Sequence, residues 1–352
     1  MNEFTLPTPY YKKKEKTKMK RLVLIDGINF FYRGAWSGVS QDMKTIHGED
    51  MTYVLAYFRN LATLVSRFRG DDNTFIICWD GGYDERLRIS SEAVKAGLIQ
   101  KSYKQERRES HDIEDEEEKR KAIEFMRQMR VARDYTGMTN VAQMSMKGEE
   151  ADDIIGSYSV KYAGDFDEIL LVTTDKDYFQ LLTDKVRIYN SGKNEYRDLQ
   201  YLKSEYNLDS GAQWIDVGAL AGESGPTSDT IYGVQGIGYK TAAKLIAEYG
   251  SLDRLFEQSL AALAPDILKC GNDVKLLSQK VKDRSYRLTH HRKELSVLAS
   301  KEIVDLAKRL KAMRTFLPVE IPPTSPSWTD FDRTFRTMGV PLGRGVTDTL
   351  TE

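Results

Sequence analysis

Short apolar runs alternate with segments of helical periodicity through the first half of the chain. The runs are RLVLIDG (21–27), NTFIICWDGG (73–82) and EILLVTTDKD (168–177). Apolar runs of this length are typical of strands buried in a parallel sheet. Between the first two runs, apolar residues recur at the spacing of one face of an amphipathic helix: Val54, Tyr57, Phe58, Leu61, Leu64 and Val65. The alternation predicts an α/β domain with a parallel sheet.

Each of the three predicted strands ends in aspartate. Asp26 ends the first, Asp80 follows the second, and Asp175 and Asp177 follow the third. One aspartate in such a place is a common turn or cap residue. In parallel sheets, however, functional sites form beyond the carboxyl ends of the strands. Acids at the ends of all three strands therefore predict a site at that edge.

A denser group of acids lies in GEEADDIIGSYS (148–159), where Glu149, Glu150, Asp152 and Asp153 fall within five positions. Acids at a helix N-terminus bind free N–H groups and suit the helix dipole, so capping is one explanation. Capping needs only one or two carboxylates, whereas divalent ions need several oxygen ligands. The acids that could supply two such ions for two-metal phosphodiester chemistry are Asp26, Asp80, Glu150, Asp152, Asp153, Asp175 and Asp177.

The helix expected after this acid group has one apolar face. Its positions follow the i, i+3, i+4, i+7 rule and should be buried: Ala151, Ile154, Ile155 and Tyr158. The acids of the first turn flank that face. The pattern therefore predicts a helix that is packed on one side and carries carboxylates at its start.

A glycine-rich turn opens a second amphipathic helix in GVQGIGYKTAAKLIAEYGSLDRL (233–255). A turn of Gly233, Gly236 and Gly238 exposes backbone N–H groups to a phosphate, aided by the helix N-terminus. The segment lacks the preceding strand of a dinucleotide fingerprint and the GK[ST] ending of a P-loop. It predicts a helix–hairpin–helix element that binds duplex backbone without reading sequence. The candidate DNA contacts are Gly236, Gly238, Lys240 and Lys244.

Composition narrows the class of protein. The chain has 352 residues, 40% hydrophobic and 30% charged, which allows two domains and a sizeable core. No apolar run approaches the ~20 residues that span a bilayer, and no secretory signal is expected. Cys78 and Cys270 fit a reducing compartment and offer no metal-ligand spacing.

The net charge of −1 conceals a separation of charge. Residues 1–21 and residues 86–108 each carry seven Lys or Arg against two Glu, a local +5 in each block. Such blocks are the usual footprint of phosphate binding, although many basic stretches are solvated faces. Residues 1–18 are expected to form a flexible basic arm. Residues 84–130 form a highly charged helical insertion, which is either functional or a solvated helix.

Together these segments resemble the 5′-nuclease superfamily of flap endonucleases, bacteriophage 5′→3′ exonucleases and ribonucleases H, and the 5′-nuclease domain of bacterial DNA polymerase I. The matching pieces are LVLIDGINFFYR, WDGG, GEEADDIIGSYS, LLVTTDKDYFQLL and SDTIYGVQGIGYKTAAKLIAEYGSLDRL, with weaker similarity through FLPVEIP (316–322). The resemblance implies a PIN-like parallel-sheet nuclease domain (19–205) with a helical arch (84–130). A helix–three-turn–helix duplex-binding domain (206–315) and a C-terminal extension (316–352) follow. The extension begins with the prolines of a loop or linker, PVEIPPTSPS (318–327).

The resemblance also assigns roles to individual residues. The strand-end acids Asp26 and Asp80 match metal ligands, as do E-A-D-D (Glu150, Asp152, Asp153) and D-x-D (Asp175, Asp177). Glu149 falls outside the pattern and is assigned a capping or solvated role. In the arch, Lys104 would orient or neutralise the scissile phosphate, Tyr103 would stack on a base, and Arg107 follows. Arg33 is either a phosphate contact or a surface arginine.

One stretch departs from the family pattern. The family has G-D-x-x-D-N before the hairpin, supplying two more acids, whereas this chain has AGESGPTSDTIYGV (221–234). Glu223 takes the place of the first acid and Asp229 that of the second, with two extra residues between them. Glu is longer than Asp, and the insertion can shift either side chain. The departure therefore affects the expected affinity and geometry of the second metal ion.

The resemblance predicts a free-standing, metal-dependent 5′-nuclease, acting on flapped, nicked or RNA-primed DNA as a flap endonuclease and 5′→3′ exonuclease. The expected cofactors are two Mg²⁺ ions, replaceable by Mn²⁺, and K⁺ at the glycine hairpin. Expected partners are DNA and replication proteins, and no membrane association is expected. The protein is expected to be a monomer in the cytoplasm, which would be the cytoplasm of the host bacterium if the protein is phage-encoded.

Two alternatives stay open. One is a catalytically weak DNA-structure-binding protein of the same fold, suggested by the altered Glu223–Asp229 stretch. The other is a haloacid-dehalogenase-like phosphatase, since a strand followed by Asp26 and Gly27 resembles its nucleophile loop. That class needs a second Asp two residues on, where this chain has Ile28.

Overall fold

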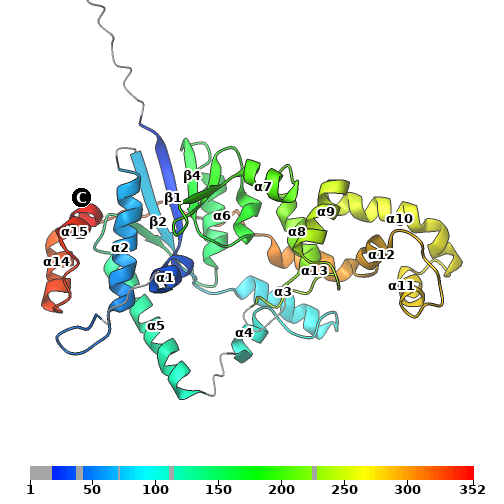
Figure 1. Cartoon of the computed structure of the whole chain (residues 1–352), viewed down its shortest axis with the longest axis horizontal. Coiled ribbons are helices and arrows are strands. Elements are labelled where there is room, and N and C mark those ends of the chain that lie inside the picture. The colour runs from blue at the N-terminus through cyan, green and yellow to red at the C-terminus, as the bar shows by residue number, and fades with distance from the viewer. Residues whose placement is uncertain (1–17, 37–42, 70–71, 111–114, 224–227) are drawn as a thin grey trace, which may run out of the picture.

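The computed structural model describes residues 18–36, 43–69, 72–110, 115–223 and 228–352. Its centre is a six-stranded sheet in the order β3-β2-β1-β4-β5-β6 (Figure 1). The strands are β1 (Lys20–Asp26), β2 (Asp72–Cys78), β3 (Ala142–Met144), β4 (Glu168–Val172), β5 (Val186–Asn190) and β6 (Glu195–Arg197). Only the β5–β6 pair is antiparallel. The predicted parallel sheet is confirmed, and its three predicted strands are the adjacent β2, β1 and β4.

Helices cover both faces of this sheet because side chains alternate along each strand. In β1, Leu22 and Leu24 enter one core while Val23 and Ile25 enter the other. The first core includes residues of α6 (Ala151–Lys161), η1 (Asp177–Leu181), α7 (Leu199–Tyr206) and α8 (Gln213–Ala221). The second includes residues of α1 (Gly27–Trp36), α2 (Thr52–Arg67) and α5 (Glu116–Thr136). Each fully buried aliphatic side chain contributes roughly 1.5–3 kcal/mol.

The helical part predicted from residue 206 extends away from one side of the sheet (Figure 1). It comprises α8, α9 (Tyr239–Tyr249), α10 (Leu252–Lys269), α11 (Val274–Lys282), α12 (Arg292–Ala299) and α13 (Lys301–Lys311). Trp214 of α8 is 2% exposed and belongs to the same core as the sheet residues. The helical part is therefore joined to the sheet by a continuous apolar core. Among the described helices, none is both long and apolar enough to cross a membrane.

The predicted arch consists of α3 (Asp84–Lys95), α4 (Gln105–Ser110) and the first half of α5. Asp115 caps α5 by accepting the N–H of Glu117 at 2.7 Å. The second half of α5 packs on α2, where the hydroxyls of Tyr57 and Thr136 lie 2.9 Å apart. The charged insertion is thus solvated at the start of α5 and anchored to the nuclease domain at its end.

Residues 312–327 form an irregular segment, here called the strap, which runs along α6. Within it, Leu317 donates its N–H to Ser157 Oγ at 3.0 Å, and the carbonyl of Glu320 accepts from Tyr158 Oη at 2.5 Å. The strap leads to α14 (Trp328–Thr337) and α15 (Arg344–Thr351), which lie beside α2 (Figure 1). Phe331 of α14 is fully buried, with its ring 5.1 Å from that of Phe58. The expected loop is confirmed, and the helices beyond it pack on the nuclease domain.

Candidate active site

The strand-end aspartates meet at one edge of the sheet. Asp26 ends β1, and Asp80 and Asp175 follow its two parallel neighbours β2 and β4. Burial raises the pKa of Asp26 to about 7, and the negative charges of Asp80 and Asp152 add to the shift. Burial likewise raises the pKa of Asp175, to about 6. The structure therefore brings these predicted site residues together, at a position where negative charge is only partly compensated.

The start of α6 is held by Asp80 rather than by its own acids. Asp80 Oδ1 accepts the N–H of Ala151 at 2.7 Å. Glu150 is the N-cap residue, but its side chain makes no capping hydrogen bond. The capping or solvated role predicted for Glu149 is therefore wrong, since its side chain is mostly buried and forms an ion pair with Arg314. The predicted apolar face of α6 is confirmed, with Ile154 and Tyr158 fully buried.

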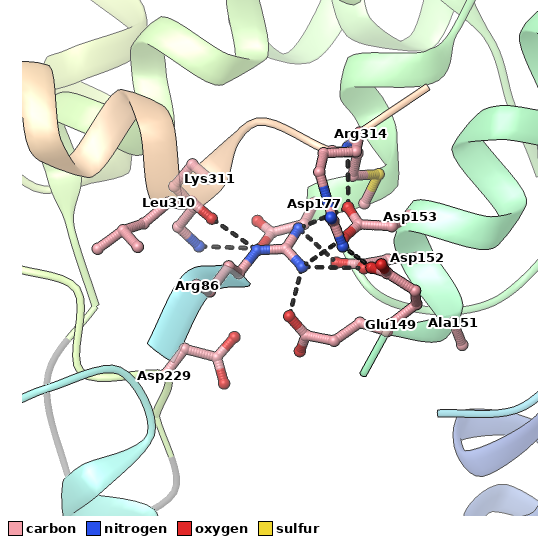
Figure 2. A network of polar contacts seen from close by, with 12 residues as sticks. Arg86, Glu149, Ala151, Asp152, Asp153, Asp177, Asp229, Leu310, Lys311 and Arg314 are labelled. Atoms are coloured by element: carbon pink, nitrogen blue, oxygen red, sulfur yellow. Dashed lines mark hydrogen bonds and ion pairs between the residues drawn. The ribbon is translucent and has the colours of Figure 1, made fainter. Parts of the chain in front are cut away.

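The E-A-D-D acids surround a buried arginine (Figure 2). Carboxylate oxygens of Glu150, Asp152 and Asp153 lie within 4.8 Å of one another, a spacing that suits a metal ion. Arg86 of α3 bonds Glu150 through Nη1, lies 2.9 and 3.0 Å from the Asp153 oxygens, and reaches Asp152 only at 3.4 Å. Asp152 is also the most exposed of these acids, at 27%, and is the one of the three that most readily faces an ion.

Asp153 differs from the other acids because both of its carboxylate oxygens already accept several hydrogen bonds. Its side chain is fully enclosed, and besides Arg86 it accepts the backbone N–H of Arg314 at 2.8 Å. The Nε and Nη2 of Arg314 lie 3.1 and 3.0 Å from Oδ2. Asp153 therefore holds the arch and the strap against α6, and metal ligation by Asp153 would require one of these bonds to open.

At the other end of the acid group, Asp177 and Glu223 share a lysine. Lys311, the last residue of α13, lies 2.9 Å from Asp177 Oδ2 and also bonds Glu223 Oε1. Tyr239 donates its hydroxyl to the same glutamate at 3.1 Å. Burial raises the pKa of Asp177 to about 7, although Lys311 opposes the shift. Asp177 and Glu223 therefore already have a positively charged partner, Lys311.

Glu223 and Asp229, predicted as a pair of ligands, lie on different sides of the site. The backbone of Glu223 pairs with that of Ile231, which turns the chain back on itself. Asp229 consequently lies near the arch, where its Oδ2 accepts from Tyr103 Oη at 3.0 Å and its Oδ1 is 3.9 Å from Lys104 Nζ. The structure therefore separates the two acids that replace the family pattern.

The arch residues line the site beside Glu150. Lys104 Nζ lies 2.5 Å from Glu150 Oε1, and Arg107, which is 47% exposed, lies 3.9 Å from Asp229. Burial opposes protonation of Lys104, but Asp229 and Glu150 hold its pKa above the ordinary value, so the ammonium stays charged. Tyr103 is 2% exposed. The prediction that Tyr103 stacks on a base is therefore wrong for this conformation, because its ring is buried.

Arg33 is not brought to the acids. It lies six residues into α1, roughly 9 Å along the helix axis from Gly27. There it lines a separate cavity of about 180 Å³ together with Arg67 and Tyr189. A phosphate contact by Arg33 stays a prediction, at a position distinct from the candidate catalytic acids.

The glycine hairpin has the geometry that phosphate binding needs. Gly236 has φ +81°, a left-handed conformation that glycine adopts freely, and Gly238 is the N-cap of α9. A Cβ at either position would meet nothing within 4 Å, so the backbone is open to a ligand. Lys240 and Lys244 are exposed on the following helix. A cleft of about 360 Å³ joins this hairpin to Glu106 and Glu223.

Three cations of the site were not predicted from sequence: Arg86, Lys311 and Arg314. Arg86 was counted among the phosphate-binding residues of 86–108, which is wrong because the side chain is buried against acids. Arg88 and Lys101 of the same block pair with Glu92 and Glu109 at 2.8 Å each. Much of the positive charge of that block is thus neutralised locally. Most of the basic block 1–21 lies outside the described residues.

The donor set fits a divalent cation. Among the described residues, no Lys, Arg or His nitrogen lies within the 4 Å of an ion pair from Asp26, Asp80 or Asp175. Although the surrounding protein partly desolvates their carboxylates, Asp80 and Asp175 keep solvent-accessible surface, so an ion can reach them from solvent. Carboxylate oxygens are the ligands that Mg²⁺ and Mn²⁺ prefer. The residues that would hold an ion are therefore Asp26, Asp80, Asp152 and Asp175.

Comparison with known proteins assigns this arrangement to a family. The family model described as 5′-3′ exonuclease, N-terminal resolvase-like domain, matches residues 21–207, and that of the 5′-3′ exonuclease C-terminal SAM fold matches residues 210–334. The chain belongs to the 5′-3′ exonuclease family. The haloacid-dehalogenase-like alternative is thereby excluded, and the predicted resemblance to 5′-nucleases is confirmed.

Individual relatives agree with this assignment. The 5′-3′ exonuclease of Bacillus subtilis is 31% identical over 244 residues, covering 67% of this chain and 73% of the relative. The thermostable DNA polymerase I of Thermus thermophilus is 28% identical over 264 residues, 74% of this chain, and the chain spans only 28% of that polymerase. A bacteriophage T5 flap endonuclease, solved with DNA and metal ions, shares the fold, with TM-score 0.62, 22% identity, and coverage of 94% and 98%.

Proposed function

We propose that this chain is a metal-dependent, structure-specific 5′-nuclease that hydrolyses phosphodiesters at the 5′ ends of flapped, nicked or RNA-primed DNA. The observation that carries the proposal is the meeting of Asp26, Asp80, Asp152 and Asp175 at one sheet edge, beside the ammonium of Lys104. Membership of the 5′-3′ exonuclease family agrees with this chemistry.

The carboxylates of this set, whose charge is only partly compensated, would hold Mg²⁺, with Mn²⁺ as a substitute. A divalent cation bound there supplies a Lewis acid that favours deprotonation of water and offsets charge on the leaving oxygen. K⁺ at the glycine hairpin also stays a proposal. The chain's own residues give the cation its place, since Asp80 is fixed by the α6 N-terminus and Asp26 by the N–H of Asn29 at 3.1 Å.

Lys104 and Arg107 provide positive charge on the opposite wall, toward the arch. We assign them to the scissile phosphate, because both lie beside the carboxylates, where Asp229 and Glu150 hold the pKa of Lys104 above its ordinary value. Lys104 has φ +55°, a conformation that non-glycine residues rarely adopt and that is often found at functional sites. Its N–H donates to the carbonyl of Asp229 at 2.8 Å, which holds this conformation.

The duplex would be bound at the glycine hairpin. Backbone N–H groups of Gly236 and Gly238 and the ammonium groups of Lys240 and Lys244 face solvent there. Contacts of this kind bind phosphates without reading bases. The cleft beside the hairpin reaches Glu223, so duplex held there would extend toward the acids. We further propose action as a monomer in the cytoplasm, alongside replication proteins.

Cleavage of a labelled 5′-flap duplex in Mg²⁺ tests the proposal. Asp80→Asn should lose cleavage while retaining DNA binding, whereas Asp209→Asn, an exposed aspartate outside the site, should cleave like the unmodified protein. Cleavage that survives Asp80→Asn would place the chemistry elsewhere. Absence of metal-dependent cleavage on flapped, nicked and RNA-primed substrates, with binding intact, would favour the DNA-structure-binding alternative.

A further inference from the structure

A lysine lies where the family resemblance predicts a second divalent ion. Lys311 Nζ is 2.9 Å from Asp177 Oδ2 and also bonds Glu223 Oε1. Its side chain is 3% exposed, against 21% for Asp177 and 27% for Glu223 (Figure 2 shows Lys311 beside Asp177). One positive charge is therefore already enclosed between these two carboxylates.

The ammonium and an ion would compete for the same space. Magnesium binds carboxylate oxygens at about 2.0–2.1 Å, so an ion bridging the same two oxygens would have to take the position of Nζ. The lysine stem is confined, since its side chain is buried and passes Gly218. The chain around Lys311 is fixed as well, because Gln180 donates to its carbonyl at 3.1 Å and accepts the N–H of Met313 at 2.9 Å. Release of the ammonium would require the end of α13 to move.

Within the part of the chain that the structure describes, Asp26 and Asp80 form no such ion pair. The oxygens of Asp26 accept only from neutral groups, the Asn29 N–H at 3.1 Å and the hydroxyls of Thr173 and Tyr178 at 3.3 Å each. Asp80 accepts the N–H of Ala151. Neutral donors leave the carboxylate charge in place, so these two acids fit a divalent ion.

We propose that the ammonium of Lys311 takes the second cation position, so that the chain binds one divalent ion, held by the set Asp26, Asp80, Asp152 and Asp175. The proposal rests on the metal-dependent function proposed above. It also accounts for the departure in sequence, because the longer side chain of Glu223 reaches the ammonium from the far side. An ammonium has no empty orbital to accept a lone pair. Lys311 is therefore a positioning residue that offsets the charge of Asp177 and Glu223.

Counting bound Mn²⁺ tests this directly, without measuring cleavage. Metal-free protein is titrated with Mn²⁺, and free Mn²⁺ is followed by electron paramagnetic resonance. The expected result is one Mn²⁺ per chain for the unmodified protein and two for Lys311→Met, which keeps the length of the side chain and removes the charge. Two ions on the unmodified protein, or one ion on both proteins, would overturn the inference. A count of zero would overturn the proposed metal-dependent function as well.

A second variant covers the case in which Lys311→Met does not fold. Glu223→Gln keeps the shape and the acceptor for Lys311 while removing one charge. If Glu223 serves the lysine, this variant should bind one Mn²⁺ with unchanged affinity, whereas Asp80→Asn should lose at least about tenfold. A loss for Glu223→Gln as large as that for Asp80→Asn would identify Glu223 as a metal ligand and overturn the inference. Thermal melting of each variant confirms folding.

Discussion

Arg86 and Asp153 form a fully enclosed fork, in which Nη1 lies 3.0 Å from Oδ2 and Nη2 lies 2.9 Å from Oδ1. The arginine belongs to α3 of the arch and the aspartate to α6 of the nuclease domain. Both charges are shielded from water, so each depends on buried ion partners for compensation: Arg86 also bonds Glu150, and Asp153 also bonds Arg314. The pair thus fixes the base of the arch to the helix that carries the E-A-D-D acids.

Arg86→Lys should lower the free energy of unfolding by about 3 kcal/mol, because a lysine cannot reproduce the two parallel bonds and leaves a buried carboxylate under-compensated. Urea denaturation measures the change. Arg88→Lys, an exposed arginine on the same helix, is the matched control and should leave stability essentially unchanged. Equal effects of the two substitutions would mean that the fork contributes nothing specific.

Asp26 is one of the buried acids, with Asp175 and Asp177, that should make the stability of the metal-free protein depend on pH. Its pKa in the folded protein is about 7, against an ordinary value of 3.8, so the folded state binds more protons between these pH values. The free energy of unfolding should therefore fall as pH rises from about 4 to 7, by up to about 1.4 kcal/mol per pH unit for one group.

Melting temperatures in EDTA between pH 5 and 8 measure this slope. Asp26→Asn should reduce the slope by the share of one group, while Asp175 and Asp177 keep theirs, and the variant should melt higher than the unmodified protein at pH 8 because one buried charge is gone. Saturating Mg²⁺ should also offset the fall in the unmodified protein. An unchanged slope in Asp26→Asn would show that the carboxylate of Asp26 is not among the titrating groups.

Lys104→Ala should reduce the single-turnover rate of flap cleavage by roughly 10²–10³, the cost of losing one preorganised charge at a reacting phosphate. Lys101→Ala is the control, since Lys101 is an exposed lysine that pairs with Glu109 at 2.8 Å. It should retain the rate. DNA affinity measured for both variants separates binding from chemistry. A rate for Lys104→Ala equal to that of the control would remove Lys104 from the mechanism.

The glycine hairpin should control how binding depends on salt. Lys240→Ala and Lys244→Ala should each reduce the slope of log affinity against log salt by about 1, if each releases one counterion. Fluorescence anisotropy with a duplex from low to moderate NaCl measures the slope. Lys282→Ala, an exposed lysine at the end of α11, is the control and should keep it. Parallel salt curves for all of these proteins would contradict the assignment of the hairpin.

Much of the nuclease domain could be predicted because its signals are local. Continuous apolar runs identify parallel strands, and parallel strands place Asp26, Asp80 and Asp175 at one edge. The spacing of Ile154 and Tyr158 likewise identifies the buried face of α6. In each case the structure is determined by a few residues that are close together in sequence.

The rest depends on contacts between distant segments. Lys311 and Arg314 reach the acids from more than one hundred residues away in sequence, and nothing in their own surroundings marks them. The sequence predicts that Tyr103 is an exposed arch residue. In the structure its ring is enclosed, and its hydroxyl donates hydrogen bonds to Glu150 and Asp229. Glu149 was assigned a capping or solvated role because it falls outside the E-A-D-D pattern, whereas the α6 N-terminus is bonded by Asp80, which follows β2 and is distant in sequence.

The return of α14 and α15 to the nuclease domain has a consequence during protein synthesis. The apolar surface that they cover, including Phe58, belongs to a helix made early, whereas Phe331 and Phe335 emerge only after the whole helical part. A ribosome adding about 5–20 residues per second therefore leaves this surface uncovered for many seconds. Over that interval the nascent chain is expected to be a client for chaperones, and the nuclease domain completes its core only after the helical part has been synthesised.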